Sequence, residues 1–228
     1  MGPLGILMLE TRFPRLLGDV GHPDTWPFPV CFATVAAATP DRVVQREPAA
    51  GLLEPFVAAA RGLVDEGAVA LTTSCGFLSL FQSELAAAVT VPVATSSLTQ
   101  VPWVQALLPD RQVGVITIDA GRLTPAHLAA AGAPADTPVV GTEGGRELSR
   151  VVLGDLSDLD AAAAAADVLE AGAELAAQCP DLGAVVLECT NMAPYRAALA
   201  QSLGCPVFDI VTLGHWLVSG AGPARHGG

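Results

Sequence analysis

The sequence contains an internal repeat, and this repeat limits the folds that are open to the chain. One copy, GAVALTTSCGFLSLFQSELAAAVTVPVATSSL, begins at residue 67, and the other, GAVVLECTNMAPYRAALAQSLGCPVFDIVTL, begins at residue 183. Each copy has a Gly-Ala-Val strand pattern, a cysteine after it, a helical pattern and a Pro-Val strand. The proline follows the cysteine by 17 residues in both copies, from Cys75 to Pro92 and from Cys189 to Pro206. We therefore predict two similar halves.

Strand and helix patterns alternate along most of the chain, which is typical of βαβ units and parallel sheets. The patterns predict strands over 4–9, 30–36, 68–73, 91–95, 112–117, 137–141, 184–188 and 206–210. They predict helices over 51–66, 77–88, 122–131, 158–178, 194–203 and 212–219.

The predicted fold class is α/β, with mainly parallel sheets in two halves that are related by a pseudo-two-fold axis. The first half is expected over residues 1–98 and the second over 99–210. Residues 211–228 are expected to pack on the first half. An active site would then lie in the cleft between the halves.

The charged residues argue against several classes of protein. Acidic residues outnumber basic ones by 23 to 11, and a net charge of −12 disfavours binding to nucleic acid or to an anionic membrane surface. Every basic residue is an arginine, so the chain has no lysine for a pyridoxal phosphate Schiff base or a Walker phosphate loop. No apolar run approaches the roughly 18 residues of a membrane span, and no signal-peptide pattern is seen.

The cysteines and histidines do not suggest disulfides or a metal. Five cysteines without a Cys-x-x-Cys pair favour the reducing cytoplasm. The histidines are scattered, and none has metal-ligand spacing from a cysteine, so neither a metal nor a cofactor is expected. Cys31, Cys179 and Cys205 are expected to be ordinary packed side chains.

Cys75 and Cys189 follow the two repeat-matched strands, at the strand ends where ligands bind in open parallel sheets. A thiol at a helix N-terminus is expected to have a lowered pKa. Two such thiols across a cleft would work as base and acid on opposite faces of one carbon, which inverts that carbon. Donors for the developing enolate would be the backbone N–H groups after each cysteine and the polar side chains of Thr73, Ser74, Thr190 and Asn191.

The sequences T-S-C-G at 73–76 and E-C-T-N at 188–191 resemble the aspartate/glutamate racemase superfamily, which includes hydantoin racemases, arylmalonate decarboxylases and maleate isomerases. The resemblance covers nearly the whole chain. It implies that Cys75 and Cys189 are the catalytic acid and base, and it is compatible with a homodimer. Glu10 and Thr11 approximate the family's acidic-hydroxyl pair after the first strand. Gly76 departs from the asparagine that glutamate racemases carry there, so free glutamate is not the expected substrate.

The expected function is that of a cofactor-independent isomerase, a racemase or epimerase acting on a small carboxylate-bearing or hydantoin-like compound. Two alternatives stay open: a decarboxylase or cis-trans isomerase of the same superfamily, and a ligand-binding protein without catalysis. Arg12 is a candidate clamp for a substrate carboxylate, whereas Arg15 is more typical of a surface salt bridge. The substrate-binding candidates are Glu10, Thr11, Arg12, Thr73, Ser74, Gly76, Thr190 and Asn191.

Overall fold

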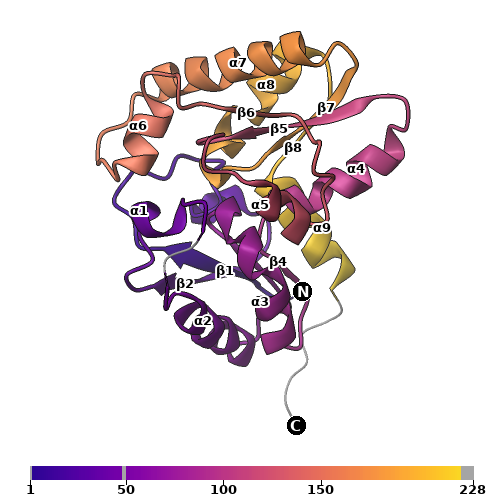
Figure 1. The fold of residues 1–228 in the computed structure, drawn as a ribbon. Helices are drawn as coiled ribbons and strands as arrows, with labels where there is room; N and C mark the ends of the chain where they lie inside the picture. The colour runs from indigo at the N-terminus through magenta and orange to yellow at the C-terminus, as the bar shows by residue number, and fades with distance from the viewer. Residues whose placement is uncertain (1, 48–49, 222–228) are drawn as a thin grey trace.

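Two four-stranded parallel sheets form the frame of the molecule (Figure 1). The structure is a computed structural model that describes residues 2–47 and 50–221. The first sheet has the order β2-β1-β3-β4 and the second the order β6-β5-β7-β8, so the halves share one topology. The strands are β1 (Leu4–Leu9), β2 (Val30–Val35), β3 (Ala70–Thr73), β4 (Val93–Ala94), β5 (Gln112–Thr117), β6 (Val139–Gly141), β7 (Leu182–Leu187) and β8 (Val207–Phe208). The predicted α/β fold class is confirmed.

Helices cover the faces of both sheets. The α-helices are α1 (Pro40–Val43), α2 (Leu53–Asp65), α3 (Gln82–Ala88), α4 (Val101–Leu107), α5 (Pro125–Ala130), α6 (Leu148–Leu153), α7 (Ala161–Gln178), α8 (Arg196–Leu203) and α9 (Ile210–Gly220). The 3-10 helices are η1 (Pro23–Thr25), η2 (Gly76–Phe81), η3 (Ser97–Gln100) and η4 (Thr190–Tyr195). The sequence patterns did not predict α1, α4 and α6, because four to seven residues are too few to show a helical period.

The central strands are apolar on both faces, as expected of parallel strands between two layers of helices. Every residue of β1 and of β7 is buried. Helix α7 begins at Asp160, whose carboxylate accepts the N–H groups of Ala162 and Ala163. Its Leu175 packs so closely on β5 that a Cβ at Gly114 would lie 2.7 Å from a Leu175 methyl carbon. The glycine therefore sets the distance between helix and sheet.

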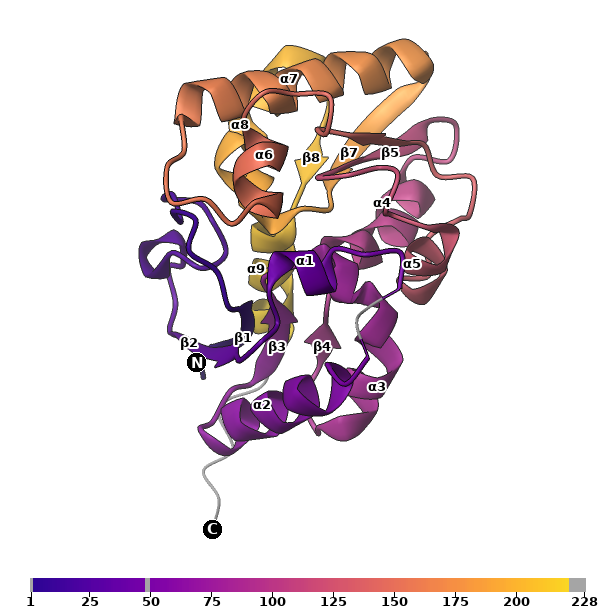
Figure 2. The ribbon, with the colours of Figure 1, turned by 60° about the vertical axis from the view of Figure 1, so that its left-hand side comes forward.

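Helix α9 follows the last strand of the second half but packs against the first sheet (Figure 2). Its Ile210, Leu213 and Leu217 share a core with Leu4 and Ile6 of β1. Of the segment expected to pack on the first half, residues 222–228 lie outside the described part of the chain. Among the described helices, none combines the length and the apolar character that crossing a membrane requires.

Two buried hydrogen bonds join the two halves where β3 and β7 end. The Thr190 hydroxyl donates to the carbonyl of Ser74 over 2.7 Å. The Ser97 hydroxyl donates to the carbonyl of Leu187 over 2.5 Å. These bonds hold the carboxyl ends of the two sheets against each other, and the cysteines of the repeat follow the same strand ends.

Candidate active site

Cys75 and Cys189 line one pocket between the halves. Each is the residue that precedes a 3-10 helix after a central strand, Cys75 before η2 and Cys189 before η4. The cavity between the thiols is narrow, about 20 Å³, which is room for about one water molecule. Its polar lining comes from Ser74, Glu188, Thr190 and Asn191. Its apolar lining comes from Leu9, Phe13, Pro40, Val44, Phe77, Ile118 and Val152.

The pKa of each cysteine is raised, not lowered as the sequence predicted. Backbone N–H groups of Phe77 and Leu78 favour the Cys75 thiolate, and the N–H of Asn191 does the same for Cys189. Full burial outweighs these bonds, because a charged sulfur would lose its hydration. The carboxylate of Glu188 raises both thiol pKa values further. In the empty pocket both cysteines are therefore neutral thiols at physiological pH.

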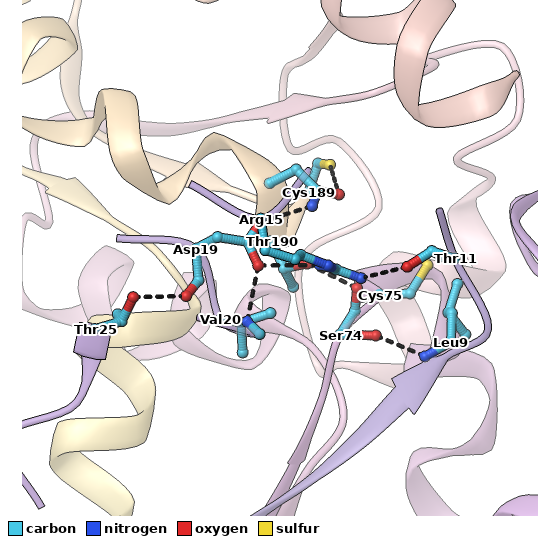
Figure 3. A network of polar contacts seen from close by, with 12 residues as sticks. Leu9, Thr11, Arg15, Asp19, Val20, Thr25, Ser74, Cys75, Cys189 and Thr190 are labelled. Carbon is cyan, nitrogen blue, oxygen red and sulfur yellow. Dashed lines mark hydrogen bonds and ion pairs between the residues drawn. The ribbon is translucent and has the colours of Figure 1, made fainter. Parts of the chain in front are cut away.

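A chain of polar side chains runs from Cys189 into the first half (Figure 3). The Cys189 thiol lies 3.6 Å from the Asn191 side-chain oxygen. The Asn191 amide nitrogen donates to Asp19 over 2.7 Å, and Asp19 pairs with Arg15 over 3.0 Å. A carboxylate only accepts hydrogen bonds, so Asp19 turns the amide oxygen of Asn191 toward the thiol.

Asp19 was not among the residues predicted from the sequence. It lies in the Pro/Gly-rich segment after β1 and is 2% exposed. Arg15 is not a surface salt-bridge residue, since its side chain is largely buried. Its spacing of four residues from Asp19 is the one sequence signal that was available for this pair.

The hydroxyls of Thr73 and Thr190 shape the backbone and are not free for a substrate. Thr73 donates to the carbonyl of Thr95 over 2.7 Å and accepts the N–H of Cys75 over 3.2 Å. Thr190 lines the pocket, but its hydroxyl is used in the bond to Ser74. The Ser74 hydroxyl accepts the N–H of Leu9 over 2.9 Å. The Thr73 hydroxyl thus holds the backbone beside Cys75, and its expected role in substrate binding stays a prediction.

Glu10, Thr11 and Arg12 are not in the cysteine pocket. Glu10 and Arg12 line a neighbouring opening that shares Pro40 with the pocket. The side chain of Arg12 is 77% exposed and pairs with Asp155 over 2.9 Å. Glu10 accepts the N–H of Ala37, and Thr11 accepts a hydrogen bond from Arg15. The chain turns outward after the buried end of β1, so Glu10 and Arg12 are exposed, whereas Thr11 is half-buried.

Glu188, which the sequence analysis did not select, is the buried acid of this site. It is 0% exposed, and its Oε2 accepts the Thr117 hydroxyl over 2.7 Å. Its Oε1 has no hydrogen-bond partner. Burial raises the pKa of Glu188 to about 7. The available signal was an acidic residue directly after an apolar strand and directly before the cysteine.

Comparisons with known proteins agree with this architecture. The sequence profile of the Asp/Glu/hydantoin racemase family matches residues 103–218, about half of the chain. A solved structure of arylmalonate decarboxylase is similar, with a TM-score of 0.60 at 20% identity over 98% of this chain and 96% of that one. An allantoin racemase from Klebsiella pneumoniae has a TM-score of 0.58 at 17% identity over 98% and 91%. These two likenesses show a common fold.

The relatives found by sequence comparison are named as lyases, not as racemases. Dimethylsulfoniopropionate lyase 3 of Emiliania huxleyi (strain CCMP1516) is 29% identical over 92% of this chain and 57% of its own length. A dimethylsulfoniopropionate lyase of Durusdinium sp. clade D is 27% identical over 95% of this chain and 74% of its own length. The chain thus spans little more than half of the Emiliania protein.

Proposed function

The chain belongs to the Asp/Glu/hydantoin racemase family, and from this premise we propose that it is a cofactor-independent enzyme that removes a proton from a carbon next to a carboxylate. The best-supported reaction is elimination from a sulfonium carboxylate of the dimethylsulfoniopropionate type. The observation that carries the proposal is the small, mainly apolar pocket lined by Cys75, Cys189 and Glu188. The names of the sequence relatives favour a lyase over the racemase expected from the sequence.

The elimination needs one base. A cysteine thiolate takes a proton from the carbon beside the carboxylate, and the C–H electron pair forms the new double bond. The bond between the next carbon and sulfur breaks, and its electron pair stays on sulfur. Dimethylsulfoniopropionate would give acrylate and dimethyl sulfide, and the thiolate would become a thiol. Backbone N–H groups at the start of η2 and η4 are the proposed donors for the charge that grows on the carboxylate.

The raised thiol pKa values support a cationic substrate. A positive charge a few ångströms away stabilises a thiolate and lowers its pKa. A sulfonium group in the pocket would therefore oppose the effects of burial and of Glu188 on Cys75 and Cys189. A substrate without a cationic group would leave the base in its unreactive protonated form.

Racemisation is the second candidate, because the two cysteines come from opposite halves and line the same pocket. A thiolate on one face and a thiol on the other are what direct inversion of a carbon requires. The same sulfurs would then exchange roles for the two enantiomers.

One assay series separates these reactions. Purified protein would be incubated with dimethylsulfoniopropionate in deuterated buffer, and dimethyl sulfide would be measured by headspace gas chromatography. In parallel, chiral amino acids and hydantoins would be followed by polarimetry and mass spectrometry. Release of dimethyl sulfide supports the lyase, and loss of rotation with uptake of one deuterium supports the racemase. Carbon dioxide release from an arylmalonate would identify a decarboxylase. Absence of all three would contradict the proposal.

A further inference from the structure

Glu188 gives the pocket its negative charge. Among the described residues that line the pocket, it carries the one carboxylate, and none carries a guanidinium or an imidazole. Its Oε1 is buried without a hydrogen-bond donor. An unpaired buried carboxylate oxygen is costly, so a native protein that keeps one is expected to gain from it elsewhere.

The carboxylate is held in place at the pocket wall. Thr117 donates to Oε2 from the end of β5, and Ile118 gives a backbone N–H from the same strand end. On the other side lies Gly76, a pocket residue, where a Cβ would stand 2.8 Å from the Glu188 carboxyl carbon. The absence of a side chain at Gly76 therefore leaves room for the carboxylate next to the thiols.

The neighbouring charges do not neutralise Glu188. The titratable groups around it are the thiols of Cys75 and Cys189, which are neutral in the empty pocket. Arg15 is the nearby cation, but it is bound to Asp19 over 3.0 Å and to Thr11 over 3.1 Å. Arg15 and Asp19 cancel each other, so the region keeps the charge of Glu188.

We propose that Glu188 is the counter-charge for an onium group, so that the pocket selects a carboxylate with a positive sulfur or nitrogen over one of the same shape in which a carbon replaces that atom. An onium group has no N–H or O–H to donate, and its charge is spread over its methyl groups. Such groups pack favourably on aromatic rings, and Phe77 lines the pocket, while the carboxylate attracts the charge. The ring of Phe13 also lines the pocket, but the Arg15 guanidinium already lies 4.6 Å from its centroid. The inference rests on the proposed function for the identity of the substrate class.

The test compares two ligands that differ in charge but not in shape: 3-(trimethylammonio)propionate and 4,4-dimethylpentanoate. Calorimetry at pH 8 is expected to show at least about tenfold tighter binding of the ammonium compound, or about 1.4 kcal/mol. In Glu188→Gln this preference should fall below about threefold, because the ammonium compound loses an attraction and the anionic pentanoate loses a repulsion. Glu10→Gln is the matched control, because Glu10 is an exposed carboxylate at the neighbouring opening, and it should keep the preference.

Acidification gives a second readout that a structural role of Glu188 would not affect. Because the pKa of Glu188 is raised to about 7, lowering the pH from 8 to 6 should weaken the preference in the native protein and leave it unchanged in Glu188→Gln. Circular dichroism would confirm that the variant is folded. A preference that survives in Glu188→Gln, that is lost equally in Glu10→Gln, or that is absent in the native protein would overturn the inference. None of these measurements needs turnover, so a protein that releases no dimethyl sulfide can still pass or fail this test.

Discussion

Gly76 lies directly against Glu188: a Cβ at position 76 would stand 2.8 Å from the carboxyl carbon and 2.5 Å from the backbone carbonyl oxygen of Glu188. Gly76 follows the first cysteine of the repeat, and Glu188 precedes the second. The two halves are therefore in direct contact beside the cysteines, and both thiols line one pocket.

Gly76→Ala is therefore expected to displace Glu188 or the start of η2. Overpacking of this kind typically costs about 1–3 kcal/mol, so the urea midpoint should fall, and turnover should fall with it. Gly62→Ala in α2 is the control, because a Cβ there meets no atom within 4 Å. That change should leave activity intact and raise stability by up to about 1 kcal/mol. Normal activity in Gly76→Ala would show that the contact does not matter.

Cys75→Ser and Cys189→Ser test the roles of the thiols. If elimination uses one base, one variant should lose about 10²–10⁴-fold in kcat and the other should lose much less. If the reaction is racemisation, both variants should lose activity to that extent. Cys205→Ser is the control, since Cys205 lies outside the pocket. Near-normal turnover in both pocket variants would eliminate thiol catalysis of either kind.

Alkylation reports on the ionisation of these cysteines. Because burial raises both pKa values and the two residues are only 8% and 7% exposed, iodoacetamide should label Cys75 and Cys189 slowly at pH 7–8. Labelling of each peptide, followed by mass spectrometry, should keep rising above pH 9 without an earlier plateau. Rapid labelling at pH 7 in the ligand-free protein would indicate thiolates that this electrostatic arrangement does not account for.

Stability should depend on pH through Glu188. Its pKa in the folded protein is about 7, above the ordinary value of 4.5, so the folded state binds the extra proton between these values. The free energy of unfolding is highest with respect to Glu188 below pH 4.5. It decreases as the pH rises to 7, because in this window Glu188 loses its proton in the unfolded state but keeps it in the folded state. Relative to Glu188→Gln, the native protein should lose about 3 kcal/mol across the window. Urea titrations at pH 5 and pH 8 measure this difference, and an equal difference at both would contradict a buried titrating carboxyl.

Arg12→Ala tests whether Arg12 binds the substrate carboxylate, as the sequence predicted, or only forms an exposed ion pair. A carboxylate clamp would raise KM strongly when removed. The structure shows an exposed pair with Asp155, which is worth about 0–1 kcal/mol, so KM and kcat should change less than about twofold. A large rise in KM would place Arg12 at the substrate after closure of the neighbouring opening.

The repeat and the hydrophobic patterns were sufficient to predict the two parallel-sheet halves and the strand ends that carry Cys75 and Cys189. These features are local, because periodicity, propensity and the equal spacing in both copies are written along the chain. The short helices α1, α4 and α6 were missed, since they depend on packing more than on periodicity.

The charge state of the site was decided by tertiary structure. A helix N-terminus favours a thiolate, but only the folded arrangement shows that desolvation and the Glu188 carboxylate outweigh it at both cysteines. The partners of Asp19 and Arg12 also became known only from the folded structure. Asp19 accepts a hydrogen bond from Asn191, and Arg12 forms an ion pair with Asp155. Burial sets these properties, together with contacts between residues more than 100 positions apart, such as Asp19 with Asn191 and Arg12 with Asp155. Of the groups involved, only Glu188 beside Cys189 could be seen in neighbouring residues of the sequence.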